Sequence, residues 1–151
     1  MPKVDLTQLP TFQGADAAAA YGGDLGAYLG RAISGAMGLA HLGANVETLM
    51  PGASSSHRHW HDRTDEIVVV LSGTLVLVEE DGAVEMGVGE IAVFPAGVEN
   101  GHCLQNRSSD AASFLVVGSR DDADRCHYSD LDLVLHPDGS LTRKDGSAPS
   151  T

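Results

Sequence analysis

Short apolar runs separated by glycine-containing turns dominate the chain from residue 42 onward. Residues 45–49 alternate between polar and apolar positions and end at Pro51-Gly52, which is typical of a half-buried strand. Residues 66–71 form an apolar run of the length of a buried strand, and Ser72-Gly73 follows it as a turn. Asp81-Gly82 is a strong hairpin signal. Further strands are expected at residues 74–79, 84–86, 91–94, 102–104 and 113–117.

This spacing of strands predicts an all-β fold, a sandwich or a small antiparallel barrel, because no helical period of useful length interrupts it. We divide the chain into an N-terminal arm (1–41), a barrel (42–119) and a C-terminal tail (120–151). The Gly22-Gly23 pair should stop any helix in the arm, which we expect to be irregular with one or two short strands. In the tail, residues 131–135 alternate as an added edge strand would, and this strand could lie on a partner subunit.

Composition excludes several classes of protein. The formal charge is −12 and the nine Lys and Arg are scattered, so nucleic-acid binding is rejected. The sequence lacks a secretion signal and any apolar stretch near the length of a membrane span, so we expect a soluble, cytoplasmic protein with no membrane partner. Cys103 and Cys126 are expected to be reduced thiols. We interpret the acidic residues near the end as a solvated face, namely Asp121, Asp122, Asp124, Asp130 and Asp132.

The candidate chemistry lies in four residues that could hold one divalent metal. His59 and His61 are two apart, so on a strand both imidazoles point to the same face. Glu66 opens the next apolar strand, where a buried carboxylate needs a cation or hydrogen-bond partners. His102 begins a later strand and could close the set from across the barrel. Three imidazoles and one carboxylate suit Mn, Fe, Co, Ni or Zn, and the sequence leaves the choice among these metals open.

His57 offers a second histidine pair, His57-Arg58-His59, in register with the first. Because the loop from the second histidine to Glu66 is tighter for His59 and His61, we favour that pair as ligands. His57 then faces the same side one step nearer the mouth of the barrel. It is either a substrate contact or a solvent-exposed residue, and the exposed interpretation is favoured.

Two motifs around these residues resemble those of a known family. The pattern Gly52…His59-x-His61-x4-Glu66-x6-Gly73 closely resembles the first cupin motif, in which Gly, HxH, Glu and Gly recur at about this spacing. One extra residue separates Gly52 from the histidine pair.

A second pattern, Gly89-x5-Pro95-x-Gly97…His102-x3-Asn106, resembles the second cupin motif. Four residues stand between Gly97 and His102, where the usual motif has two. This insertion lengthens a loop at the mouth of the barrel, so it should affect the pocket more than the ligands.

The resemblance covers about residues 42–119 and is strongest to small bacterial single-domain cupins, some of which carry the label sugar-phosphate isomerase. It implies a cupin double-stranded β-helix, a jelly-roll-like barrel of two antiparallel sheets. It also implies a metal at the centre of the barrel and a homodimer. Cupins with this type of ligand set include dioxygenases, oxalate-degrading enzymes and isomerases.

The expected function is therefore a small metalloenzyme of the isomerase or dioxygenase type. The metal would act as a Lewis acid on a sugar or small organic acid, or bind O2 if it is iron or manganese. The alternative is a metal-dependent protein that binds or senses a small ligand without turnover. Fold alone does not decide between them.

Polar residues near the mouth are the candidates for contacting the substrate. Glu99, the carboxylate of the lengthened loop, is the candidate general acid or base. Arg63 could approach the mouth of the barrel, whereas Arg58 should point outward. With only one arginine near the mouth, the sequence gives little support for recognition of a phosphate group. Tyr21 and Tyr28 could reach the pocket from the arm. The candidate substrate-binding residues are His57, Arg63, Asn100 and Asn106.

Overall fold

Strand β5 (Glu66–Ser72) shows how the sequence builds this barrel. Its side chains alternate, so Val68 and Val70 are 4% and 1% exposed while Ile67 and Leu71 face outward. Gly73 then turns the chain at a φ of 71°. A Cβ atom at Gly73 would lie 2.8 Å from that of Ala112, so both the backbone conformation and the close approach require glycine. The predicted Ser72-Gly73 turn is thus confirmed.

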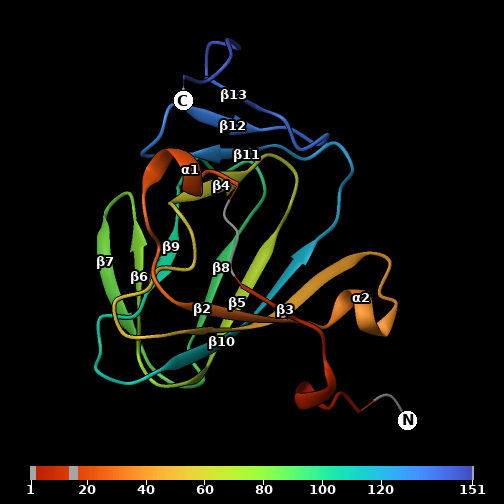
Figure 1. The fold of residues 1–151 in the computed structure, drawn as a ribbon, viewed down its shortest axis with the longest axis vertical. Coiled ribbons are helices and arrows are strands. Elements are labelled where there is room, and N and C mark those ends of the chain that lie inside the picture. The colour runs from red at the N-terminus through yellow and green to blue at the C-terminus, as the bar shows by residue number, and fades with distance from the viewer. Residues whose placement is uncertain (1–2, 14–16, 151) are drawn as a thin grey trace.

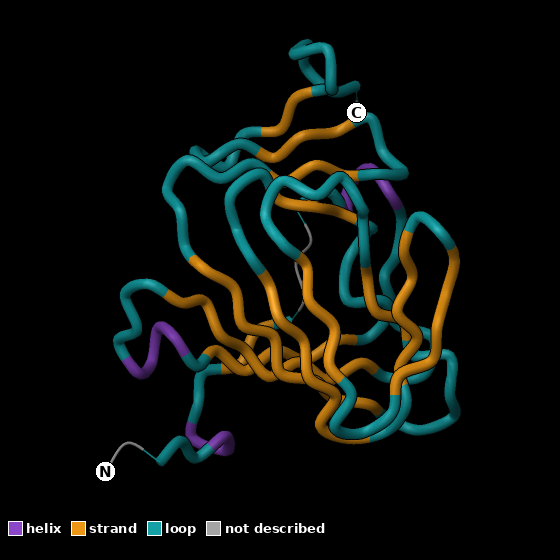
Figure 2. The backbone as a smooth tube through the Cα atoms, turned by 180° about the vertical axis from the view of Figure 1, so that it is seen from behind, coloured by secondary structure: helices purple, strands orange, loops and turns teal. Residues whose placement is uncertain are grey.

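The fold is seen in a computed structural model that describes residues 3–13 and 17–150. The larger sheet has six strands in the order β1-β2-β3-β10-β5-β8, and its neighbours pair antiparallel. The bounds of its other strands are β1 (Thr11–Phe12), β2 (Tyr28–Ala32), β3 (Leu42–Leu49), β8 (Ile91–Phe94) and β10 (Ala112–Ser119). Figure 2 shows these strands curving along one side of the barrel.

A three-stranded antiparallel sheet forms the opposite wall in the order β7-β6-β9. Its strands are β6 (Leu75–Glu79), β7 (Gly82–Met86) and β9 (Cys103–Gln105). Glu79 pairs with Gly82, so the Asp81-Gly82 hairpin is confirmed. Buried residues of both walls form one hydrophobic core, which includes Leu49, Leu75 and Phe114. The predicted all-β cupin-like barrel is therefore the observed architecture.

The C-terminal tail forms a third sheet that covers one end of the barrel (Figure 1). Its strand order is β13-β12-β11-β4, so the tail pairs with a strand from the barrel region. The strands are β4 (His59–His61), β11 (Cys126–Tyr128), β12 (Leu133–Leu135) and β13 (Leu141–Thr142). The tail is thus part of the wall that surrounds the candidate site.

The predicted edge strand at 131–135 is β12, but its expected position was wrong. β12 lies between β11 and β13 of its own chain, so it is an inner strand. Leu133 and Val134 are 4% and 7% exposed within this chain alone. These side chains are already covered without a partner subunit.

The N-terminal arm contains the two short strands that its sequence predicts, β1 and β2, and they extend the six-stranded sheet. Its helices are a 3₁₀ turn (Leu6–Gln8), α1 (Ala19–Gly22) and α2 (Ser34–Met37). Helix α1 ends at the predicted glycine pair and lies beside the tail sheet (Figure 1). Within the described residues, no helix combines the length and apolarity that a membrane span requires.

Candidate metal centre

Strand β4 brings His59 and His61 to the same face, as alternation predicts. Their ring centroids are 5.2 Å apart. Trp60 points to the other face, where it stacks on His127 of β11 with ring centroids 4.1 Å apart. The register of β4 on the tail strand therefore sets which histidines face the barrel interior.

Glu66 and His102 approach this pair from two other parts of the barrel. His102 forms a β-bridge with His59, and their backbones exchange hydrogen bonds of 3.2 and 3.0 Å. His102 Nε2 lies 3.0 Å from one carboxylate oxygen of Glu66, and His61 Nε2 lies 3.9 Å from the other. The ligand atoms of His59, Glu66 and His102 all lie within 4.8 Å of one another. Three of the four residues that the sequence singles out thus form one compact group, and His61 lies beside it.

Each imidazole faces a protein oxygen with its Nδ1 atom. His59 Nδ1 is 2.9 Å from the His57 carbonyl, His61 Nδ1 is 2.6 Å from Asp124, and His102 Nδ1 is 3.5 Å from the Asn100 carbonyl. Each of these oxygens can accept from an Nδ1–H group, and in that tautomer the Nε2 lone pair is the one that would bind a metal. The donor set therefore fits a divalent transition metal by its chemistry and orientation.

The protonation of the site favours metal binding at neutral pH. Burial lowers the pKa of His59 to about 4, so its imidazole is neutral. Burial alone would raise the pKa of Glu66, but the hydrogen bond with His102 and the nearby imidazoles lower it to about 2. The neutral imidazole of His59 and the ionised carboxylate of Glu66 are the ligand forms that a divalent cation binds.

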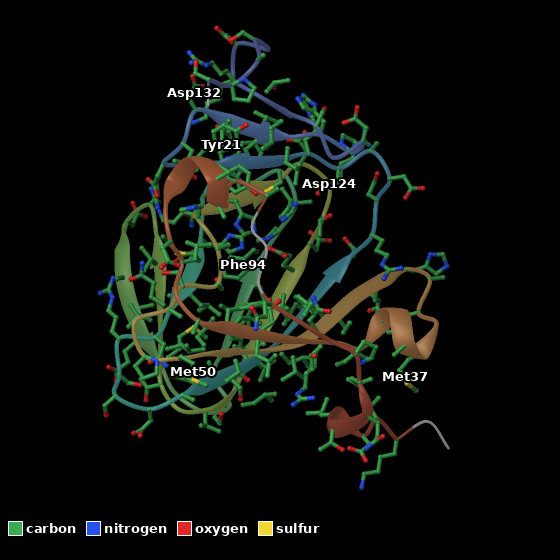
Figure 3. All side chains as sticks on the ribbon, in the orientation of Figure 1. Tyr21, Met37, Met50, Phe94, Asp124 and Asp132 are labelled. Carbon is green, nitrogen blue, oxygen red and sulfur yellow. The ribbon has the colours of Figure 1, made fainter. Side chains whose placement is uncertain are left out.

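Phe94 stacks on His102 with ring centroids 3.5 Å apart and an interplanar angle of 3°. Figure 3 shows Phe94 within the barrel. Cys126, opposite His61 on β11, forms a second group of nearby ligand atoms with His59 and His61, also within 4.8 Å. The centre is thus enclosed by an aromatic ring and a thiol from separate strands.

A cavity of about 490 Å³ opens beside this cluster. Apolar side chains from the core line much of it, including Val68, Phe94 and Phe114. Apart from the candidate ligands and Tyr128, its polar lining comes from the arm, strands β3 and β10 and the loops, namely Tyr28, Asn45, Glu47, Ser55, Ser56, Thr64 and Ser119. Among the described residues that line it, none is Lys or Arg. A smaller cavity of about 40 Å³ lies on the side of His61, Glu66 and Asn100.

Three of the predicted contact residues lie away from the larger cavity. Glu99 is exposed, and Arg63 is an exposed side chain 3.7 Å from Asp121. The ring of His57 packs against Gly22 of α1, where an added Cβ atom would lie 2.3 Å from it. None of these three lines either cavity, so the structure does not support Glu99 as the general acid or base or His57 and Arg63 as substrate contacts.

The two asparagines have different positions. Asn106 is 1% exposed and is used structurally, because its amide donates to the carbonyls of Leu49 and Asp110. We therefore withdraw it as a substrate contact. Asn100 lines the smaller cavity, and its side chain binds Glu79 and the backbone of Glu80. Its substrate role stays a prediction.

Several residues that shape the site lay outside the sequence-based candidates. Glu47 lines the cavity, although the sequence of its strand shows only an ordinary alternation of polar and apolar residues. Asp124, labelled in Figure 3, was interpreted as part of a solvated face, yet it holds His61 and is 15% exposed. Tyr128 of β11 also lines the cavity, with its ring centroid 6.1 Å from that of His59. Tyr28 reaches the cavity as expected, whereas Tyr21 packs beside the tail sheet.

Comparisons with known proteins agree with this architecture. The structure described as a sugar phosphate isomerase of the cupin superfamily from Silicibacter pomeroyi is 39% identical, with a TM-score of 0.88, and covers 99% of this chain and 98% of its own. A protein from Acidithiobacillus ferrooxidans, provisionally named a sugar phosphate isomerase, is 26% identical, with a TM-score of 0.73 and coverages of 83% and 80%.

A predicted oxalate decarboxylase from Thermotoga maritima shares the fold at 21% identity, with a TM-score of 0.63 and coverages of 78% and 97%. No curated protein sequence matches the chain. Residues 45–118 match the cupin domain family. With three imidazoles and a carboxylate clustered inside an antiparallel barrel and a close structural relative along its whole length, this chain belongs to the cupin superfamily.

Proposed function

We propose that this protein is a divalent-metal-dependent enzyme of the isomerase type that acts on a small, uncharged sugar or related hydroxycarbonyl compound. The observation that carries the proposal is the cluster of His59, His61, Glu66 and His102, of which His59, Glu66 and His102 line the 490 Å³ cavity. These four residues would hold the metal. A bound metal would supply Lewis-acid chemistry at a carbonyl group, or O2 chemistry if it were iron or manganese.

The residues of the chain support this activity by position and by exclusion of water. The backbone bridge between His59 and His102 fixes two imidazoles, and Asp124 fixes a third. Phe94 and the tail strand β11 cover the cluster, so a substrate in the cavity would meet a largely apolar enclosure. Such an enclosure strengthens the electrostatic interactions of the polar groups that remain.

The charge of the lining favours an uncharged substrate over a phosphate ester. The two structural relatives named above carry the words sugar phosphate isomerase. A phosphate group is usually recognised by Arg or Lys. The described lining has no such residue and contains the carboxylates of Glu47 and Glu66, which would repel a phosphate dianion.

The test is elemental analysis of anaerobically purified protein. We expect about one divalent metal per chain in the wild type, and loss of that metal in His61→Ala and Glu66→Ala. Both variants should keep the β-sheet circular dichroism spectrum, because the removed ligands are not part of the hydrophobic core.

The matched control is His127→Ala, since His127 lies on the opposite face and stacks on Trp60. It should retain the metal. Full metal occupancy in either ligand variant would contradict the proposed ligand set. Screens of uncharged sugars and of oxygen consumption then separate an isomerase from a dioxygenase, and tight binding without product would support the ligand-binding alternative.

A further inference from the structure

A second polar cluster lines the cavity apart from the four candidate ligands. Asn45 and Glu47 share the inward face of β3, and Tyr28 lies on the neighbouring strand β2. Tyr28 and Asn45 lie close enough to Glu47 to lower the pKa of its carboxyl group. The cluster therefore places one carboxyl group beside two polar side chains at the cavity wall.

The ring of Phe12 lies beside this cluster and lines the same cavity. Gly30 is the β2 residue directly opposite Glu47, and an added Cβ atom there would lie 2.2 Å from the Phe12 ring. The centroids of the Phe12 and Tyr28 rings are 6.0 Å apart. Glu47 thus shares its part of the cavity wall with two aromatic rings.

The environment of Glu47 suits proton transfer at neutral pH. Burial raises its pKa, the hydrogen bonds from Tyr28 and Asn45 lower it in part, and the charge of Glu66 raises it again, which gives about 7. A group with this pKa exchanges protons readily at physiological pH. The titratable residues that line the same cavity are Tyr28 of β2, His59 of β4, Glu66 of β5, His102, Cys103 of β9 and Tyr128 of β11.

We propose that Glu47 is the general base and acid that moves a proton between two adjacent carbons of a hydroxycarbonyl substrate, with Tyr28 and Asn45 as its positioning residues. The inference rests on the proposed function, because Glu47 and the candidate metal ligand Glu66 line one cavity. The carboxyl group of Glu47 and the proposed metal would therefore face the same substrate space.

The proton transfer balances without a further reactant. The Glu47 carboxylate accepts the proton from the carbon that bears the hydroxyl group, and the C–H electron pair becomes the carbon–carbon double bond of an enediolate. The carbonyl π electrons move to the carbonyl oxygen, which takes the hydroxyl proton. The other oxygen then forms the new carbonyl, and Glu47 returns its proton to the former carbonyl carbon. No oxidant or reductant is consumed.

The test follows the exchange of carbon-bound hydrogen in deuterium oxide by proton NMR. The probes are dihydroxyacetone and a panel of uncharged aldoses and ketoses with three to six carbons. Glu47→Gln should lower the exchange rate on the order of 10²–10⁴-fold while keeping the metal content measured by elemental analysis. Glu47→Asp should retain part of the rate, and Glu85→Gln on the exposed face of β7 should retain all of it.

The Tyr28→Phe variant tests whether Tyr28 tunes the pKa of Glu47, because a purely structural role of Tyr28 would leave the pH–rate profile in place. The Tyr28 hydrogen bond lowers the pKa of Glu47. Its loss should raise that pKa and shift the rising limb of the pH–rate profile to higher pH. Carbon-13 NMR of labelled glutamate should show the same shift in the Glu47 carboxyl, which is identified by its absence in Glu47→Gln.

The outcomes separate the two proposals. Wild-type exchange in Glu47→Gln with metal retained would overturn the role of Glu47 and leave the proposed function standing. A metal-loaded wild type that exchanges no probe would also overturn this role. A wild type that binds no metal would refute the proposed function and this inference together, and an unmoved carbon-13 titration in Tyr28→Phe would refute the role of Tyr28.

Discussion

Asp124 is the residue on which the orientation of His61 depends most directly. Its Oδ2 atom lies 2.6 Å from His61 Nδ1, and its Oδ1 atom accepts from the backbone of Arg63. A carboxylate in this position orients a ligating imidazole and raises its basicity. We therefore place Asp124 with the four candidate ligands as part of the proposed metal centre.

We predict that Asp124→Asn weakens metal binding by about 10- to 100-fold, because the amide is a poorer partner for Nδ1–H. Competition against a chromophoric chelator would measure this change. Asp122→Asn is the matched control, since Asp122 is an exposed neighbour. Equal affinity in both variants would argue against an orienting role for Asp124.

At the residue scale, the sequence is informative where local periodicity decides the geometry. Two histidines spaced two apart must share a face of a strand, so His59 and His61 were predictable. Glu47 was not, because a polar residue on an alternating strand reads as solvent-facing until closure of the barrel turns that face inward. Asp124 lies 63 residues from His61, and spacing in an acidic loop carries no sign of that contact.

Among the elements, strand β4 is held mainly by the tail. Its ladder partner is β11, and Arg58 just before it fastens the tail to the β6–β7 hairpin. The Arg58 guanidinium binds Asp130 through two nitrogen atoms at 2.8 and 2.5 Å, and Glu80 at 2.6 Å. The expectation that Arg58 points outward from the barrel holds, but its side chain is only 16% exposed because these carboxylates cover it.

We expect Arg58→Ala to lower the free energy of unfolding by roughly 1–2 kcal/mol, since charge-assisted hydrogen bonds are lost while both acidic partners remain partly solvated. The rate of amide hydrogen exchange should increase more in β11 and β12 than in the rest of the barrel. Arg107→Ala is the control, because exposed Arg107 contacts the side chain of nearby Gln105. Equal amide exchange rates in β11 and β12 of the two variants would show that Arg58 does not hold the tail in place.

The strands were predictable as elements, but their partners were not. The turns at Gly73 and at Asp81-Gly82 follow from backbone chemistry that neighbouring residues specify. Residues 131–135 gave only the length and alternation of a strand. Whether such a strand lies at an edge, on a partner subunit or inside its own sheet depends on contacts made by residues distant in sequence, here β11 and β13.

For the whole molecule, the homodimer expected from the family resemblance stays a prediction. The tail strand that suggested it is buried in its own chain, but other apolar side chains are open. Ile67, Leu71, Ile91 and Val93 on β5 and β8 are 46%, 42%, 62% and 61% exposed. Contiguous apolar surface of this kind is typical of a protein interface.

We predict a dimer at micromolar concentration by sedimentation velocity, with dissociation favoured in Ile91→Asp because a charge would be buried at the contact. Val88→Asp, on the exposed turn before β8, is the control and should leave association unchanged. A monomeric wild type would refute the prediction.

The pairing of β4 with β11 also sets an order of events in time. On a translating ribosome the four candidate ligands, the last of them His102, emerge before Asp124 and the β11 strand that aligns β4. A nascent chain halted before residue 124 has the four candidate ligands but lacks Asp124 and the strand that aligns His59 and His61. Binding of the proposed metal would therefore follow the synthesis of β11.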